Sequence, residues 1–210
     1  MDLEFRCEPL SNPLDLMDML GEISTSSGVT KFEFVAYIPG AEYDFTESLA
    51  TRKFDLDSMR RVELDNLASD LVRHIYKPDE LEEKLKRVVV GLVSHVPGGH
   101  LPQIDFSCVS SEEEVYDFVR DLRLRGYVLL TGNGYHFQGS EIMEPDRWRE
   151  LLNNLRGYEI VDLDWISECN DSGYSVLRVT SDAYEKPYVP KVIARLDKVL
   201  RYKGQLELPL

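Results

Sequence analysis

The feature that most restricts the fold is the stretch "GYVLLTGNGYHFQG", in which two apolar runs flank a glycine-rich turn at residues 131–134. The runs "YVLL" and "YHFQ" have the length and the β-branched or aromatic content of short strands. Asn133 and Gly134 between them readily adopt the positive φ angles of a tight turn. The stretch therefore predicts a β-hairpin and an antiparallel sheet. It leaves open whether His136 packs in the core or takes part in chemistry.

Predicted strands and helices alternate on both sides of this hairpin. Ser111 and Glu114 fit a capping box, in which each side chain satisfies a backbone N–H at the start of a helix. Pro145 lies near the start of another predicted helix, where its fixed φ angle suits the first turn. In chain order we predict a strand at 101–109, a helix at 110–126, the hairpin, a helix at 145–157, strands at 158–166 and 174–181, and a helix at about 190–200.

The N-terminal part of the chain has a different pattern. Residues 1–28 are predicted to be irregular with one short helix at 14–20, and they are followed by an alternating strand at 31–38. Helical apolar spacing from 55 to 76 precedes a β-branched run at 87–96, which is typical of a buried strand. We expect an N-terminal α/β portion at residues 1–97, partly helical, and a core at 98–210, together forming one compact unit. The fold class is α+β, with a mainly antiparallel sheet and flanking helices.

Composition excludes several classes of protein. The 210-residue chain has no apolar run of the roughly 18 to 20 residues that a membrane helix needs. Its acidic first residues lack the apolar segment of a signal peptide, so we expect a cytoplasmic protein that does not contact a membrane. Cys7, Cys108 and Cys169 are scattered without the spacing of a zinc site, and we expect reduced thiols.

The charge of the chain is strongly acidic but uneven. A formal net charge of −14 opposes unaided binding to nucleic acid, because cationic contacts to phosphate dominate that affinity. The same acidity would suit a basic protein partner. Between Lys186 and Lys203, however, six cations accompany one acidic residue, Asp197. This basic C-terminal segment would either neutralise carboxylates of the same protein or bind single-stranded nucleic acid.

Four ionisable residues in apolar surroundings are candidates for chemistry. Asp105 lies in an apolar strand, where a carboxylate needs a hydrogen-bond partner, a cation or solvent. Asp162 and Asp164 are two residues apart, which would place both on one face of a strand, either solvated or around a metal. Arg178 also lies in an apolar strand, where its partner would be an acidic side chain or a phosphate.

The order of these residues resembles the archaeo-eukaryotic primase superfamily, which includes primase small subunits and primase-polymerases. "IDFS" is similar to the family's first carboxylate motif and supplies Asp105. "TGNGYH" is similar to its histidine-containing strand and supplies Thr131 and His136. The resemblance covers residues 100–195 and implies a primase-polymerase-like (RRM-like) core.

The later motifs extend the resemblance. "VDLD" is similar to the third carboxylate motif, and it supplies Asp162 or Asp164. "VLRVTSDAYEK" is similar to the segment near the end of the family's core, with Arg178 and Lys186 at matching separation. Carboxylates in these positions suit Mg²⁺ or Mn²⁺, and the cations suit a triphosphate.

The resemblance implies a role for each matching residue. Catalysis would involve Asp105, His136 and Asp164. A nucleoside triphosphate would be bound by Thr131, His136, Arg178 and Lys186. A divalent metal, Mg²⁺ or Mn²⁺, would be bound by Asp105, Asp162 and Asp164.

One departure from the family bears directly on activity. Ser107 stands where the first motif carries a second aspartate, and a hydroxyl binds a divalent cation more weakly than a carboxylate does. We therefore expect a primase-like nucleotidyltransferase-fold domain that binds nucleotide and metal, and whose nucleic-acid synthesis could be weakened or lost. Two alternatives remain open. One is a metal-dependent site for a small nucleotide without a template, and the other is a non-catalytic acidic α+β module that binds a basic protein.

Overall fold

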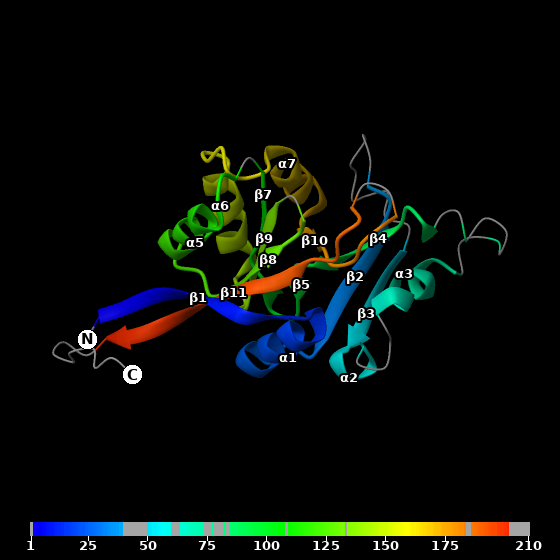
Figure 1. Ribbon diagram of the computed structural model, residues 1–210, viewed down its shortest axis with the longest axis horizontal. Helices are drawn as coiled ribbons and strands as arrows, with labels where there is room; N and C mark the ends of the chain where they lie inside the picture. Colours follow the sequence, from blue (N-terminus) through cyan, green and yellow to red (C-terminus); the bar gives the residue numbers. More distant parts are fainter. Residues whose placement is uncertain are drawn as a thin grey trace.

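The computed structural model describes residues 2–39, 50–59, 64–73, 77, 82, 85–107, 109–132, 134–183 and 186–201, so the predictions made for Cys108 and Asn133 lie outside the described residues. The chain forms two antiparallel sheets flanked by helices, which confirms the predicted α+β class (Figure 1). Among the described residues, no helix has the length and apolar character that crossing a membrane requires.

The larger sheet has five strands in the order β1-β11-β8-β9-β7, and every neighbouring pair is antiparallel. Its centre is the predicted hairpin, in which Leu130 lies opposite Tyr135. The turn closes with a hydrogen bond of 2.9 Å from the Thr131 N–H to the Gly134 carbonyl. Gly132, rather than Gly134, has the positive φ angle, at 105°. The strands are β1 (Asp2–Leu14), β7 (Gln103–Phe106), β8 (Gly126–Leu130), β9 (Tyr135–Gly139) and β11 (Lys191–Arg201).

The second sheet has four strands in the order β10-β4-β2-β3. These strands are β2 (Lys31–Tyr37), β3 (Ala50–Asp55), β4 (Val89–Val93) and β10 (Val176–Arg178), and a small ribbon of β5 (His95–Val96) and β6 (Gly99–His100) follows β4. The first strand of the chain joins the five-stranded sheet, whereas β10 joins the strands of the N-terminal part. Each sheet therefore takes strands from both sides of residue 98.

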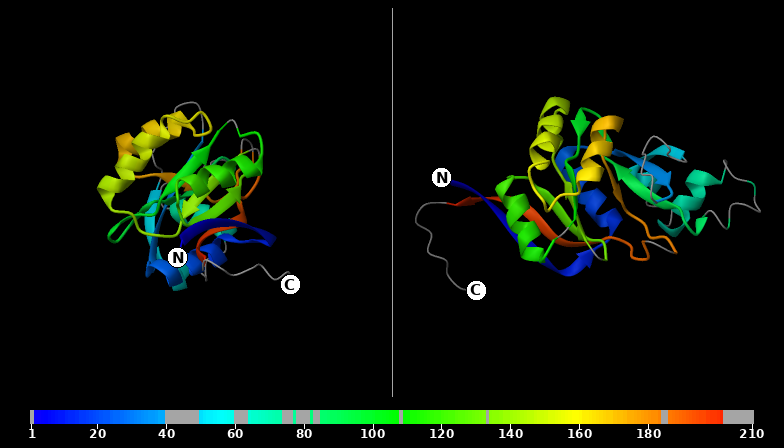
Figure 2. Two further views of the ribbon diagram at one scale, coloured as in Figure 1. Left: turned by 90° about the vertical axis from the view of Figure 1, so that its left-hand side faces the viewer. Right: turned by 90° about the horizontal axis from the view of Figure 1, so that it is seen from above.

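Two groups of helices cover the sheets from different sides. Figure 1 shows α1, α2 and α3 on one side and α5, α6 and α7 on the other, and the left-hand view of Figure 2 shows α6 and α7 above α1 and α2. The first group packs on side chains such as Phe34 and Leu92, and the second packs on side chains such as Ile104 and Phe137. The helices are α1 (Leu16–Ser27), α2 (Leu56–Met59), α3 (Leu64–Val72), α5 (Glu112–Asp121), α6 (Pro145–Leu155) and α7 (Leu163–Ser172).

The residues predicted to begin two helices, at α5 and α6, do so in the structure. The Ser111 hydroxyl accepts a hydrogen bond from the Glu114 N–H at 3.4 Å, and the Glu114 carboxylate accepts one from the Ser110 N–H at 2.9 Å. Pro145 is the first residue of α6, where the missing N–H costs nothing because no carbonyl precedes it in the helix. These contacts fix where α5 and α6 begin, and so hold the helical layer over the hairpin.

The structure corrects the prediction for residues 158–166. The expected strand is instead the approach to α7, because the Asp162 carboxylate accepts a hydrogen bond from the Trp165 N–H at 2.9 Å and caps the helix. Trp165, Ile166 and Cys169 then face the core at helical spacing. Asp162 and Asp164 consequently do not share a strand face.

Two terminal segments also differ from the prediction. Residues 2–14 form β1 and not an irregular start, because residues 2–9 and Leu14 pair with β11, with a register shift between Pro9 and Leu14. Residues 191–201 form β11 and not a helix, since they lie between β1 and β8. A register shift between Val192 and Ala194 sets Lys191 opposite Leu130 and Arg195 opposite Tyr127. The predicted helix at about 190–200 is therefore wrong.

Candidate functional site

The structure brings Asp105 and His136 together on one face of the five-stranded sheet. Asp105 of β7 and His136 of β9 are direct partners in the antiparallel ladder, and side chains of such partners point to the same side. The His136 Nε2 and Asp105 Oδ1 atoms are 3.5 Å apart. The hairpin therefore answers the question left open by the sequence, because His136 faces a carboxylate and not only apolar neighbours.

His136 is buried, with 7% of its side chain exposed. Burial, assisted by the charges of Arg178 and Lys186, lowers the pKa of His136 to about 3, so the imidazole is neutral at physiological pH. Its Nδ1 atom is buried without a hydrogen-bond partner. A polar atom of this kind normally finds a partner, so the unsatisfied nitrogen is consistent with a ligand at this position.

Asp105 is held in an environment that opposes its negative charge. Burial first, and the neighbouring Asp162 second, raise the pKa of Asp105 to about 7, although Arg178 and Lys186 act in the opposite direction. One third of the Asp105 side chain remains exposed. The carboxyl group is therefore reachable, is partly protonated near neutral pH, and would be stabilised as an anion by a cation beside it.

Asp162, at the start of α7, lies next to Asp105. Its backbone N–H donates to the Asp105 carbonyl at 3.0 Å, and Phe106 forms an isolated bridge with Val161. Capping α7 therefore also sets a second carboxylate next to Asp105. Asp164 is exposed in the first turn of the same helix. The structure brings together two of the three predicted metal-binding aspartates.

Arg178 of β10 binds the backbone of three segments. One terminal nitrogen donates to the carbonyls of Thr180 and Tyr188, each at 2.6 Å, and the other donates to the Thr131 carbonyl at 3.1 Å. These bonds connect the β8–β9 turn with the chain on both sides of residues 184–185. The positive charge of Arg178 lowers the pKa of both Asp105 and His136. Sequence reasoning considered an acidic partner or a phosphate for Arg178, and not carbonyl groups.

Lys186 is the second cation near the pair. It is exposed, and its charge also lowers the pKa of Asp105 and of His136. Its backbone is fixed, because the Lys186 N–H donates to the Asp182 carboxylate and the Asp182 N–H donates to the Lys186 carbonyl, both at 2.8 Å. The site thus combines two carboxylates, a neutral histidine and two cations.

The site fits a divalent cation only with help from a ligand. Across the described parts of the chain, no three His, Cys, Asp or Glu side chains form a group that could hold a metal. Mg²⁺ commonly uses one or two carboxylates and completes its coordination with substrate phosphates and water. Asp105 and Asp162 match that arrangement. Ser107, just beyond β7, is half-buried and its N–H donates to the Ile160 carbonyl at 2.9 Å.

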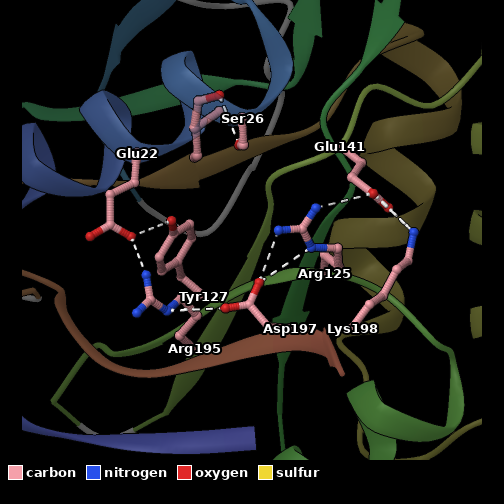
Figure 3. Close-up of polar contacts among 9 residues, drawn as sticks. Glu22, Ser26, Arg125, Tyr127, Glu141, Arg195, Asp197 and Lys198 are labelled. Carbon is pink, nitrogen blue, oxygen red and sulfur yellow. Dashed lines mark hydrogen bonds and ion pairs between the residues drawn. The ribbon is translucent and has the colours of Figure 1, made fainter. Parts of the chain in front are cut away.

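A cavity of about 820 Å³ lies elsewhere, between α1 and strands β8 and β11. Figure 3 shows an alternating chain of charged side chains, four of which, Glu22, Arg125, Arg195 and Asp197, line this cavity. Arg195 binds Glu22 and Asp197 at 2.9 and 3.2 Å. The chain continues through Arg125, 3.0 Å from Asp197, and through Glu141, which binds both Arg125 and Lys198. Sequence reasoning missed this network because Glu22 and Arg195 are 173 residues apart. Arg195 and Lys198 therefore neutralise carboxylates of their own protein, which is one of the two outcomes considered for the basic segment.

Comparison with known families identifies the chain. The family model described as AEP-like, Archaeo-eukaryotic primase 1D-like, matches residues 68–191. This match spans more than half of the chain and includes the Asp105–His136 pair and Arg178. The chain belongs to this family. The predicted resemblance to the archaeo-eukaryotic primases is thereby confirmed.

A solved structure is similar to this chain at the level of the fold. The catalytic domain of primase RepB′, crystallised in complex with initiator DNA, superposes with a TM-score of 0.51 and 12% identity, covering 84% of this chain and 82% of that domain. A second structure of primase RepB′ has a TM-score of 0.49 and 14% identity, covering 85% of this chain and 55% of that one. No curated protein matches the sequence. The fold of this primase-like domain is therefore that of a primase catalytic domain.

Proposed function

We propose that this primase-like domain binds a nucleoside triphosphate and a divalent metal at the Asp105–His136 pair, as a nucleotidyltransferase-type site. The observation that carries the proposal is the composition of the site on the sheet. A carboxyl whose pKa is raised to about 7 faces a buried neutral histidine, next to a second carboxylate and within the field of two cations. Metal and triphosphate together would satisfy these groups, whereas either one alone would leave charges unmatched.

Asp105 and Asp162 would bind the Mg²⁺ or Mn²⁺ ion. When bound, such an ion neutralises phosphate oxygens and lowers the pKa of an attacking hydroxyl. The exposed position of Asp164 favours a role outside the direct ligands of the metal, although its side chain remains within one helical turn of Asp162. Asp105 must release its proton before it can bind the ion, so binding should strengthen as pH rises towards 7.

His136, Lys186 and Arg178 would contact or attract the triphosphate in different ways. The neutral imidazole of His136 can donate a single N–H to a phosphate oxygen. Lys186 is exposed and can approach phosphate as a mobile point charge. Arg178 and Thr131 would act mainly by position, because the Arg178 guanidinium holds the Thr131 carbonyl and thus the turn before β9. Arg178 adds positive charge where the triphosphate lies.

The degree of activity would depend on Ser107. If the domain is active, it joins a nucleoside triphosphate to a 3′-hydroxyl on a nucleic-acid template, and the missing second aspartate would slow that step. Binding of a nucleic-acid strand is supported by the related catalytic domain, whose structure contains initiator DNA. In this chain Arg195 and Lys198 are already paired with carboxylates, so exposed Lys191 and Lys186 would contribute most of the attraction.

Isothermal titration calorimetry with ATP and Mn²⁺ tests the proposal. Wild-type protein should bind ATP only when Mn²⁺ is present, and EDTA should abolish the heat. Asp105→Asn should weaken this binding by at least tenfold, because it removes the only charge that Asp105 offers to the ion. His136→Asn should weaken it less, and Asp164→Asn serves as a matched exposed control.

The alternative is a non-catalytic acidic module that binds a basic protein partner. Two observations favour it: the net charge of −14, and the lack of a three-residue metal group among the residues that the structure describes. Absence of ATP heat in the wild type, with and without Mn²⁺, would contradict the proposed function and leave this module. Binding of ATP without any strand binding would instead favour the small-nucleotide alternative.

A further inference from the structure

Tyr188 is an exposed aromatic residue that borders the proposed site. Tyr188 lies in the segment between β10 and β11, and 59% of the residue is exposed to solvent. Pro187 precedes it and Pro190 follows two residues later, and each proline fixes its own φ angle. An exposed tyrosine is common and by itself indicates no function. The contacts that hold Tyr188 in place are less common and point to a role.

The Tyr188 ring rests on the glycine turn between β8 and β9. A Cβ atom built on Gly132 would lie 2.5 Å from the Tyr188 Cδ2 atom, so only glycine leaves room for the ring. The Tyr188 carbonyl accepts a hydrogen bond from Arg178, which also binds the Thr131 carbonyl beside that glycine. Backbone and ring are thus both fixed against the turn that leads into β9, while much of the residue's surface remains open to solvent.

The surroundings of Tyr188 connect it to the proposed nucleotide site. Arg178 binds both the Tyr188 carbonyl and the Thr131 carbonyl, at the start of the turn that leads into β9 and His136. Lys186, a second cation, lies two residues before Tyr188. Tyr188 therefore lies beside two cations that could attract a triphosphate, and its ring contacts the turn that leads to His136. A nucleotide with its phosphates beside those cations extends its base outwards, and a fixed ring is a suitable surface for that base.

We propose that the Tyr188 ring is a stacking platform for a nucleobase whose phosphates bind at the Asp105–His136 site. This inference rests on the proposed function, in which the carboxylates and cations bind the metal and the phosphates. It adds a contact for the base, which those groups do not bind. Every base has an aromatic face, so stacking tolerates all four bases. The base belongs either to the incoming nucleoside triphosphate or to a nucleotide of a bound strand.

The experiment measures what the base adds to binding. Affinities for ATP and for inorganic tripolyphosphate are measured with Mn²⁺, and affinities for a short thymidine oligonucleotide and an abasic oligonucleotide of equal length are measured in parallel. In each pair, the ratio of the two affinities is the contribution of the base. In wild-type protein at least one ratio should be about tenfold, as expected for one aromatic–base contact.

In Tyr188→Ala, the affinity ratio that is about tenfold in the wild type should fall close to one. The affinity for tripolyphosphate or for the abasic oligonucleotide should stay unchanged. Tyr188→Phe keeps the ring and should keep the ratio, whereas Tyr188→Leu keeps bulk without the ring and should lose most of it. Tyr158→Ala, at a residue that is 46% exposed and contacts Phe118, is a control for loss of an exposed tyrosine. If the ratio for ATP over tripolyphosphate falls, the base belongs to the incoming nucleotide. If the ratio for the thymidine over the abasic oligonucleotide falls, the base belongs to a bound strand.

The outcomes separate this inference from the proposed function. Retention of both wild-type ratios in Tyr188→Ala overturns the stacking platform while metal-dependent binding of tripolyphosphate still supports the site. Ratios near one in the wild type overturn it as well. Failure of the wild type to bind either the triphosphates or the strands overturns the proposed function and the stacking platform together.

Discussion

Replacing Asp105 by asparagine should stabilise the fold while removing the metal ligand. The substitution keeps the shape of the side chain and its ability to contact His136, but it removes a charge that the folded state opposes. Burial and Asp162 raise the pKa of Asp105 from its ordinary value of 3.8 to about 7. The folded protein therefore holds a proton that the unfolded chain releases, and ionisation at high pH costs free energy of folding.

The size of the effect follows from the shift. A change of about three pKa units corresponds to about 4 kcal/mol at most, since one unit is about 1.4 kcal/mol. One third of the Asp105 side chain is exposed, so solvent screening reduces the expected gain to about 1–2 kcal/mol. Because the folded pKa is the higher one, the cost is absent below pH 4, grows between pH 4 and pH 7, and is complete above pH 7. The burial of His136 contributes equally to the free energy of unfolding of both proteins, so it cancels in the difference between them.

Urea denaturation at pH 5 and at pH 8 measures the difference. Asp105→Asn should exceed the wild type in free energy of unfolding at pH 8, with a smaller excess at pH 5. Asp164→Asn, which removes an exposed carboxylate from the favourable first turn of α7, should give no gain at either pH. Equal stability of Asp105→Asn and wild type at pH 8, or a gain that does not change with pH, would refute the argument that the fold opposes this charge.

Three further outcomes are expected. The affinity for Mn²⁺ in the presence of ATP should rise about tenfold per pH unit below pH 7 and level off above it, because the ion competes with the proton on Asp105, and a flat titration profile would contradict this. Ser107→Asp should tighten Mn²⁺ binding by adding an anionic ligand, and unchanged affinity in the same titration would place Ser107 outside the site. Arg178→Lys should lower the free energy of unfolding by about 2–3 kcal/mol in urea, because an ammonium group cannot reproduce the forked contacts to three carbonyls, and unchanged stability would show that these contacts are dispensable.

The parts of the fold that could be predicted are those governed by neighbours in the chain. The hairpin follows from two short apolar runs around a glycine turn, and its register places His136 opposite Asp105 once β7 lies beside β9. The start of α5 follows from the spacing of Ser111 and Glu114. In each case the deciding contacts join residues close in sequence, so the pattern alone contains the information.

The errors arise where distant contacts decide the structure. The cations of residues 191–201 have helical spacing, yet β1 and β8 on either side make this segment a strand. Residues 2–14 have little pattern of their own and become a strand because β11, at the other end of the chain, pairs with them. The alternation around Asp162 resembled a strand, but a single capping hydrogen bond to the Trp165 N–H begins a helix there. Tertiary pairing outweighs local propensity in the first two cases.

Arg178 shows why one buried residue can serve both folding and binding. Its three carbonyl contacts fix the turn below Tyr188 and the segment that leads to β11, so the geometry around the site depends on it. The carbonyl groups orient the guanidinium, and its positive charge acts on the ionisable groups of the site. That charge favours the ionised form of Asp105, which metal binding requires, and the neutral form of His136. Loss of Arg178 should therefore lower stability and triphosphate affinity together, while loss of Lys186, which is exposed, should lower affinity alone.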